Sequence, residues 1–332
     1  MPHRITLIPG DGIGPEVAEA TKTVLAATGV SLVWDEQDAG LAAIEKTGDA
    51  LPEATIESCR SNGVALKGPT TTPVGGGHTS ANVRLRRELD LYASVRPTKT
   101  IPGVETPYKD VDLVVFRENT EGLYSGLENR VADGVVLSIK VVTAQATDRI
   151  ARAAFEYAVK NGRKSVAAVH KANIMKLGDG LFLERVNRIA KEYPQIEYSE
   201  VIIDALCMRL VREPQKFDVL LMENLYGDIV SDLCSGLVGG LGVVPGANIG
   251  SEAAVFEAVH GSAPDIAGKG VANPLGLIKS AVLMLEHIGE LSASERLANA
   301  INDAMVSGEA LTADLGGSAK TADVADAIIS RL

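Results

Sequence analysis

Asp228 and Asp232 stand four residues apart in the sequence GDIVSD. The apolar residues around them follow a helical pattern, so both carboxylates fall on one helix face. Two neighbouring anions repel each other unless a cation neutralises them, and oxygen ligands suit Mg²⁺ or Mn²⁺. Asp204 is a candidate third ligand. Acidic residues that cap a helix N-terminus explain the same spacing equally well, so spacing alone leaves both interpretations open.

Cationic and hydrogen-bonding side chains gather in and after the segment SANVRLRR at residues 80–87. Guanidinium groups bind carboxylates through two parallel hydrogen bonds, so several converging arginines suit a di- or tricarboxylic acid. A solvated helix face with salt bridges to Glu88 and Asp90 is the more common outcome for such a segment. The candidate residues are Ser80, Asn82, Arg86, Arg96 and Arg117.

Two other segments are candidates for function. Lys171 follows the apolar run 165–169 and so falls at a strand end, where α/β enzymes often place functional groups. A solvated lysine is the more common interpretation. Residues 257–268 form a polar segment punctuated by glycines, which is typical of a ligand-binding loop. An aspartate can accept both ribose hydroxyls of adenosine and repel a 2′-phosphate, so Asp265 favours NAD over NADP if it lies beside the ribose.

The turn GDGIG at residues 10–14 lies between a strand pattern and a helix that begins at Pro15. It fails the GxGxxG fingerprint because proline occupies the position of the third glycine. The turn is either a simple connection or a cofactor-contacting loop. The sequence also contains neither a GxxxxGKS/T phosphate loop nor a GxSxG elbow, which argues against kinase-like and hydrolase-like functions.

Short apolar runs alternate with helical patterns along the chain, which predicts an α/β architecture. Residues 5–8, 111–116 and 217–222 read as strands, and residues 15–28 and 147–160 as helices. In the second half of residues 122–143, apolar runs flank Asp133-Gly134 and predict a hairpin. A projecting arm of this kind often binds a second subunit.

With 332 residues, of which 46% are hydrophobic, the chain is long enough for one large or two intimate domains. The net charge of -11 argues against nucleic acid or an anionic membrane as a partner. Three widely spaced cysteines favour a reducing compartment over a disulfide framework. The N-terminus lacks a signal-peptide pattern and no apolar run spans a bilayer, so we expect a cytoplasmic protein.

Seven segments, taken together and in order, resemble the β-decarboxylating dehydrogenases, the family of isocitrate, 3-isopropylmalate and homoisocitrate dehydrogenases. The resemblance implies the isocitrate/isopropylmalate dehydrogenase-type α/β fold, which is not a conventional Rossmann fold. It implies a large, cofactor-binding domain from residues 1–91 and 239–332, a central domain at 92–238, and an intersubunit clasp at about 122–143 in a homodimer. The matching segments are residues 8–16, 67–77, 80–96, 116–124, 170–175, 224–232 and 260–273.

The resemblance also implies a role for each site residue. The metal ligands for Mg²⁺ or Mn²⁺ are Asp228 and Asp232, with Asp204 from the partner subunit. Lys171, also from the partner, helps to remove the hydroxyl proton, and Tyr124 protonates the product of decarboxylation. The substrate-binding residues are Ser80, Asn82, Arg86, Arg96, Arg117 and Asn173. The cofactor-binding residues are Ile13, Thr71, Thr72, Glu257, His260, Gly261, Asp265, Ile266 and Asn273.

Substrate and coenzyme follow from variable positions of the family. Ser80 and Asn82 resemble the isocitrate pattern, since a hydrogen-bonding pair suits a carboxylate better than an isopropyl group. Asp265-Ile266 resembles the NAD form. We therefore expect NAD-dependent oxidation of isocitrate through oxalosuccinate to 2-oxoglutarate and CO2. Homoisocitrate, 3-isopropylmalate and a noncatalytic regulatory subunit of the same fold are the alternatives, and Glu223 has no assigned role.

Overall fold

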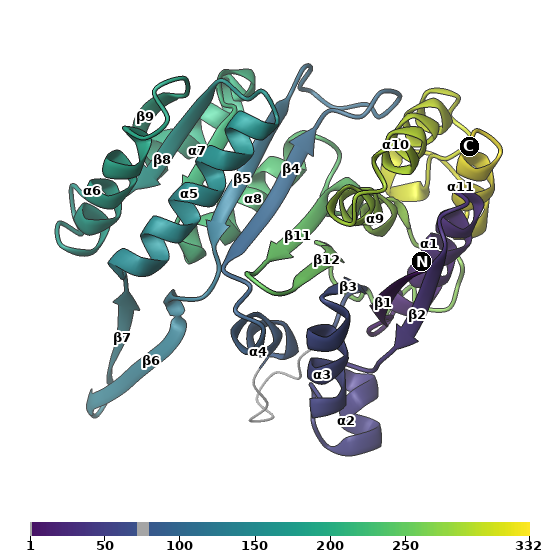
Figure 1. The fold of residues 1–332 in the computed structure, drawn as a ribbon, viewed down its shortest axis with the longest axis horizontal. Coiled ribbons are helices and arrows are strands. Elements are labelled where there is room, and N and C mark those ends of the chain that lie inside the picture. Colours follow the sequence, from purple (N-terminus) through teal and green to yellow (C-terminus); the bar gives the residue numbers. More distant parts are fainter. Residues whose placement is uncertain (1, 72–79) are drawn as a thin grey trace. The chain divides into compact units, whose positions relative to one another are not determined.

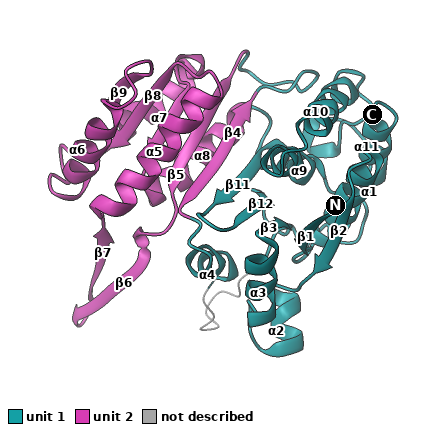
Figure 2. Ribbon diagram, viewed as in Figure 1, with its two compact units in different colours: residues 1–91, 100–109, 238–332 teal, residues 92–99, 110–237 magenta. Residues whose placement is uncertain are grey.

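The structure, a computed structural model, describes residues 2–71 and 80–332. The chain forms two compact units (Figure 2). Unit 1 contains Met1–Leu91, Thr100–Lys109 and Val238–Leu332, and unit 2 contains Tyr92–Lys99 and Asp110–Leu237. Thr100–Lys109 belongs to unit 1, although the sequence-based division leaves this segment in the central domain. Its Gly103 lies so close to Met305 that a Cβ atom would stand 2.3 Å from the Met305 carbonyl oxygen.

Unit 1 has a largely parallel sheet of strands from both ends of the chain (Figure 1). Neighbouring strands are parallel except β11 and β12, which are antiparallel. The strands, in spatial order, are β2 (Leu32–Glu36), β1 (His3–Ile8), β3 (Val64–Lys67), β12 (Ala254–Ala258) and β11 (Pro245–Ile249). The helices are α1 (Gly14–Ala27), α2 (Leu41–Thr47), α3 (Glu53–Asn62), α4 (Ala81–Glu88), α9 (Leu275–His287), α10 (Leu291–Val306) and α11 (Thr321–Ile329), with 3-10 turns η2 (Leu241–Val243) and η3 (Ala313–Leu315).

Helix α1 illustrates how sequence pattern produces packing in unit 1. Pro15 stands in the first turn, where its missing N–H costs no hydrogen bond. The apolar positions recur at helical spacing, and the predicted inward set Val17, Ala18, Thr21, Val24 and Leu25 is buried. This face packs against α11 and α9, which fixes the turn that precedes the helix.

In unit 2, the sheet strands β4 and β5 are antiparallel and the other neighbours are parallel. Within this unit, α5 lies on one face of the sheet and α8 on the other (Figure 1). The strands, in spatial order, are β4 (Ala93–Lys99), β5 (Asp112–Glu118), β10 (Val219–Met222), β8 (Ser165–His170) and β9 (Glu197–Ile202). The helices are α5 (Ala144–Lys160), α6 (Gly178–Ala190), α7 (Ile203–Arg212) and α8 (Asn224–Leu237), with the 3-10 turn η1 (Pro214–Lys216).

The strands β6 (Gly122–Ala132) and β7 (Val135–Val141) form a separate antiparallel hairpin in unit 2. The turn lies at Asp133-Gly134, as the sequence pattern predicts. Gly134 has a φ of 71°, a conformation that glycine adopts without strain. The hairpin exposes several apolar side chains, including Leu127, Val131 and Val136.

The predicted fold class can be checked against this architecture. The α/β prediction is confirmed, because central strands such as β10 are buried along their whole length and are flanked by helices, as in parallel sheets covered on both faces. Within the described residues, no helix has the length and apolar character needed to cross a membrane.

Candidate active site

A cluster in unit 2 joins three predicted site residues from three elements. Arg117 near the end of β5 donates to Asp228 Oδ1 at 2.5 Å, and the Tyr124 hydroxyl of β6 donates to Asp228 Oδ2 at 2.5 Å. The Arg117 guanidinium also lies over the Tyr124 ring, 5.1 Å from its centre. Arg117 is 1% exposed, whereas the side chain of Asp228 is 39% exposed. A buried cation therefore faces a carboxylate that solvent and ligands can reach.

Two residues of α8 that sequence analysis left without a role build this cluster. Asn224 Oδ1 accepts from Arg117 Nε at 3.0 Å and from its second terminal nitrogen at 2.7 Å. Gly227 gives Arg117 its space, since a Cβ atom there would stand 2.4 Å from Arg117 Cγ. Both belong to the segment 224–232 that carries the family resemblance, but their contacts depend on packing between α8 and β5.

A second arginine, Arg96, contacts Asp232, the other aspartate of the pair. Arg96 of β4 is 7% exposed and donates to the Ser231 hydroxyl at 2.6 Å and to Asp232 Oδ1 at 3.3 Å. Burial raises the pKa of the Asp232 carboxyl and the neighbouring Asp228 raises it further, while Arg96 opposes both.

Tyr124 is held in its protonated form. Partial burial raises the pKa of its phenol, and the hydrogen bond to Asp228 raises it further, because the anion disfavours a second negative charge. The hydroxyl therefore retains its proton at neutral pH and is positioned to donate it.

The carboxylates of Asp228 and Asp232 are hard oxygen donors in adjacent turns of α8, which fits Mg²⁺ or Mn²⁺. Two donors do not complete a protein metal site. In the part of the chain that the structure describes, no group of three or more His, Cys, Asp and Glu residues is arranged to hold a metal ion.

Lys171 and Asp204 form a separate ion pair in unit 2. Lys171 follows β8, as predicted, and its ammonium contacts Asp204 Oδ1 at the start of α7. This contact lowers the pKa of the Asp204 carboxyl. The connection to α6 is anchored by Asp179, a buried residue that sequence analysis missed, whose Oδ2 accepts the Lys171 backbone N–H at 2.6 Å. Asn173, in the same connection, is exposed.

In unit 1, Arg86 belongs to a buried charge cluster and not to a solvated helix face. Its guanidinium lies 3.4 Å from Glu257 Oε1, and its side chain is 12% exposed. Lys67, which sequence analysis did not single out, pairs with Glu257 Oε2 at 2.7 Å, and Asn248 donates to Oε1 at 2.7 Å. Burial alone would raise the pKa of Glu257, but Lys67 and Arg86 outweigh it and hold that pKa well below its usual range.

The remaining substrate candidates of unit 1 lie at the start of α4. Asn82 Oδ1 accepts from the Thr70 hydroxyl at 2.9 Å, and Asn82 lines a narrow hollow together with Arg86 and Glu257. Ser80 is the residue before α4, and its side chain makes no capping hydrogen bond to the described part of the helix. Thr72 lies outside the described residues.

The predicted cofactor residues of unit 1 are held around the GDGIG turn. Ile13 N–H donates to the Ser262 carbonyl at 2.8 Å, and the Thr71 and Ser262 hydroxyls are 2.5 Å apart. A Cβ atom at Gly12 would stand 2.0 Å from the Ser262 carbonyl oxygen, so only glycine permits this approach. Asp11, whose Oδ2 accepts the Thr71 N–H at 2.6 Å, was not predicted.

The cofactor candidates between residues 260 and 273 differ in exposure and in whether their side chains already bond to the protein. Asp265 and Gly261 are exposed, and Ile266 is half-buried. Burial lowers the pKa of His260, which favours its neutral imidazole. Asn273 is buried and donates to Asp314 Oδ2 at 3.0 Å. The free carboxylate of Asp265 is thus available to a ligand, whereas the amide of Asn273 already has a protein partner.

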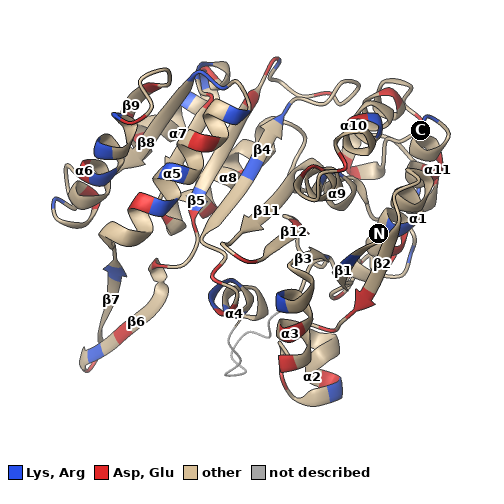
Figure 3. Cartoon of the chain, in the orientation of Figure 1, with Lys and Arg blue, Asp and Glu red and all other residues tan. Residues whose placement is uncertain are grey.

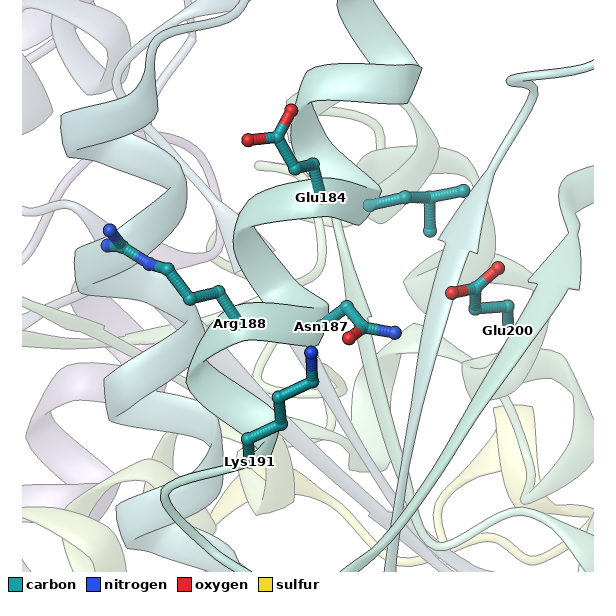
Figure 4. A pocket seen from close by; sticks show the side chains of 6 residues that line it. Glu184, Asn187, Arg188, Lys191 and Glu200 are labelled. Atoms are coloured by element: carbon teal, nitrogen blue, oxygen red, sulfur yellow. The ribbon is translucent and has the colours of Figure 1, made fainter.

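Other charged features of unit 2 do not add to this site. Figure 3 shows Lys and Arg interleaved with Asp and Glu on α5 and α6. Figure 4 shows a pocket beside α6, where Glu184, Asn187, Arg188 and Lys191 lie near Glu200 of β9. Its lining includes none of the predicted site residues.

Comparison with known proteins identifies the class of this molecule. A family model for isocitrate/isopropylmalate dehydrogenase matches residues 4–328. The chain belongs to the isocitrate/isopropylmalate dehydrogenase family, and the resemblance drawn from its motifs is confirmed. The fold expected for that family is confirmed too, because a crystal structure of isocitrate dehydrogenase from Methylococcus capsulatus matches with a TM-score of 0.96 at 53% identity, covering 99% of both chains.

Two curated relatives match the chain over its length. One, from Arabidopsis thaliana, is named NAD isocitrate dehydrogenase catalytic subunit 5, mitochondrial. It is 53% identical over 332 residues, which is 100% of this chain and 89% of that protein. The other, from Dictyostelium discoideum, is named as a mitochondrial regulatory subunit of NAD isocitrate dehydrogenase. It is 47% identical over 331 residues, which is 99% of this chain and 92% of that protein.

Proposed function

We propose that this chain catalyses the NAD-dependent oxidative decarboxylation of isocitrate to 2-oxoglutarate and CO2. The observation that carries the proposal is the cluster of unit 2, in which buried Arg96 and Arg117 face the half-exposed Asp228 and Asp232 beside a protonated Tyr124. Cations, metal-binding oxygens and a proton donor are the groups that oxidation and decarboxylation of a hydroxy acid require. The names of the relatives support isocitrate as the hydroxy acid.

Substrate binding is assigned to the arginines and to the start of α4. Arg86, Arg96 and Arg117 hold substrate carboxylates through paired hydrogen bonds. Ser80 and Asn82 receive the additional carboxylate of isocitrate, for which an isopropyl group would be a poor substitute. The uncapped Ser80 hydroxyl supports this assignment, and Asn173 contributes a further amide.

The metal site is assigned to Asp228 and Asp232, completed by Asp204 of the second subunit in a homodimer. A bound Mg²⁺ or Mn²⁺ would supply positive charge where negative charge develops on the substrate's C2 oxygen. Lys171 of the second subunit helps to remove the proton from the C2 hydroxyl, which its side chain can accept once the ammonium has released a proton of its own. The exposed apolar side chains of the β6–β7 hairpin support a subunit interface.

The chemical sequence has an oxidation and a decarboxylation. Bound NAD would supply the acceptor for the C2 hydride, and loss of that hydride together with the hydroxyl proton would convert isocitrate into oxalosuccinate. The bond from C3 to its carboxylate then breaks, CO2 leaves, and the electron pair remains as an enolate. Tyr124 donates its proton to C3 to give 2-oxoglutarate and regains a proton from solvent.

The coenzyme site is assigned to unit 1, with Ile13, Thr71, Thr72, Glu257, His260, Gly261, Asp265, Ile266 and Asn273. The exposed carboxylate of Asp265 suits the two ribose hydroxyls and repels a 2′-phosphate. We place the protein in the cytoplasm, where its unpaired Cys59, Cys207 and Cys234 would stay reduced.

The first experiment measures NADH absorbance with purified protein, Mg²⁺ and NAD, offering isocitrate, homoisocitrate and 3-isopropylmalate separately. NADP then replaces NAD. We expect isocitrate with NAD to be fastest. A faster reaction with another acid would overturn the substrate assignment. Absence of turnover with all three would favour a regulatory subunit, which the similarity to the Dictyostelium protein makes the second candidate.

The coenzyme assignment has its own test. Asp265→Lys with Ile266→Tyr replaces an anion with a cation and a hydroxyl, so it should shift the ratio of kcat/KM for NAD and NADP toward NADP. Asp303→Asn, at an exposed position of α10, is the control. An unchanged coenzyme ratio in the double variant would contradict the assignment of Asp265.

A further inference from the structure

The segment that fails the dinucleotide fingerprint carries a side chain with an unassigned role. Glu16, in the first turn of α1, accepts three backbone N–H groups from one loop. Its Oε2 accepts from Gly268 at 3.1 Å and from Gly270 at 3.3 Å, and its Oε1 accepts from Ala272 at 3.1 Å. A carboxylate is suited to this task because it has two oxygens that only accept hydrogen bonds.

A second side chain holds the same loop from α11. The Thr321 hydroxyl donates to the Ala272 carbonyl at 2.6 Å, and the Thr321 N–H donates to the Gly270 carbonyl at 3.0 Å. Thr321 is buried and Glu16 is half-buried. Gly268 and Gly270 have φ values of 72° and 65°. The loop has no regular structure there, so its backbone N–H groups need hydrogen-bond acceptors from other elements.

The held residues lie between two groups of predicted coenzyme contacts, Asp265 with Ile266 on one side and Asn273 on the other. We infer that Glu16 is a positioning residue that fixes this loop for the adenosine half of NAD. The inference rests on the proposed function, because the loop is assigned to NAD there. Ordering the loop before NAD arrives lowers the entropic cost of binding, so Glu16 acts on coenzyme affinity.

The test compares Glu16→Gln with Glu19→Gln. Glutamine keeps the shape of Glu16 but turns one acceptor into an N–H donor that faces the loop's own N–H groups. Glu19 lies on the same helix with a 70% exposed side chain and pairs with Lys22, so it is a matched control. Calorimetry without substrate measures the Kd of NAD and of ADP-ribose, which keeps the adenosine, the diphosphate and the second ribose of NAD but lacks the nicotinamide ring.

We expect Glu16→Gln to raise both Kd values about tenfold, equivalent to about 1.4 kcal/mol. The KM for NAD should rise by a similar factor, while the KM for isocitrate and kcat at saturating NAD stay within about twofold. Equal Kd values for Glu16→Gln and Glu19→Gln in folded protein would overturn the inference. So would an equal loss of isocitrate and NAD affinity, which indicates a general structural role.

If Glu16→Gln does not fold, a second variant still tests the inference. Thr321→Val preserves side-chain shape and removes the hydroxyl that donates to Ala272, so we expect a smaller rise in the Kd of ADP-ribose. An unchanged Kd in that variant would then overturn the inference. Wild-type protein that binds neither NAD nor ADP-ribose would overturn both the inference and the proposed coenzyme, whereas binding without isocitrate turnover would contradict only the proposed function.

Discussion

In unit 1, the carboxylate of Glu257 meets Lys67, Arg86 and Asn248, and its side chain is 10% exposed. In unit 2, Asp228 meets Arg117 and Tyr124, yet its side chain remains 39% exposed. Both clusters contain an ion pair between an arginine and a carboxylate. The first has its charges matched and enclosed by the protein, so the proposed site residues Arg86 and Glu257 also stabilise the fold, while the second keeps a carboxylate accessible to a ligand.

Glu223 can be compared directly with Glu257, because it is equally buried but has fewer cations in contact with its carboxylate. It is 6% exposed, and its partner among the described residues is Lys140 of β7, which also donates to Asp179 Oδ1 at 2.5 Å. Burial raises the pKa of Glu223 to about 7, against the opposing effect of Lys140. The two buried glutamates thus shift in opposite directions: two cations and Asn248 outweigh the burial of Glu257, whereas Lys140 alone does not outweigh the burial of Glu223 and the neighbouring anions Asp179 and Glu121.

The largest effect is expected at the enclosed cluster of unit 1, which consists of Glu257, Lys67, Arg86 and Asn248. Glu257→Gln leaves Lys67 and Arg86 buried without their anion and should lower the free energy of unfolding at pH 7 by about 4 kcal/mol. Because the native pKa of Glu257 lies below its unfolded value of 4.5, its stabilisation is present above that pH and is lost as pH falls. Denaturant unfolding at several pH values measures both effects.

The control for this variant is Glu252→Gln, at an exposed position in unit 1. It should change the free energy of unfolding by less than about 0.5 kcal/mol. A Glu257→Gln protein as stable as this control would mean that the enclosed cluster contributes nothing to the fold, and the contrast with Asp228 would fail.

Substitutions in the open cluster of unit 2, which consists of Asp228, Arg117 and Tyr124, should change activity more than stability. Asp228→Asn weakens an oxygen donor to the proposed metal and should lower kcat/KM for isocitrate by roughly 100- to 1,000-fold at fixed Mg²⁺. The Mg²⁺ concentration for half-maximal activity should rise as well. Asp303→Asn is the control, and an unaltered Mg²⁺ dependence of Asp228→Asn would remove Asp228 from the metal site.

The same contrast explains what sequence could predict. The i, i+4 spacing of Asp228 and Asp232 and the strand-end position of Lys171 are local patterns, so the helix and strand that carry them follow from periodicity. Lys67 was missed because its partner is distant in sequence: Lys67 and Glu257 stand opposite each other in β3 and β12, which are neighbours only once the strand order is known. The space that Gly227 leaves for Arg117 likewise arises from tertiary packing.

Tyr124 gives the next prediction in size. Tyr124→Phe removes the proposed proton donor and should lower kcat for 2-oxoglutarate formation roughly 100-fold, within the usual range for general acid catalysis. The KM for NAD should hardly change. Tyr193→Phe, which removes a hydroxyl 3.5 Å from Glu156 Oε1, is the matched control. Equal kcat values for the two variants would show that the open cluster needs no acid at this position.

The smallest effect tests the comparison of the two glutamates by its pH dependence. In wild-type protein, the native pKa of Glu223 is raised from 4.5 to about 7, so stability is present below pH 4.5 and is lost as pH rises through 7. Glu223→Gln removes this loss. Relative to wild type, its free energy of unfolding should therefore increase by about 3 kcal/mol between pH 4.5 and pH 8.

Denaturant unfolding across that range measures the difference, with Glu197→Gln at an exposed position of β9 as the control. The control should follow wild type at every pH. A Glu223→Gln difference that is constant with pH would mean that the native pKa of Glu223 equals its unfolded value. The single cation of Lys140 would then match burial as fully as the two cations around Glu257 do, and cation number would no longer distinguish the two sites.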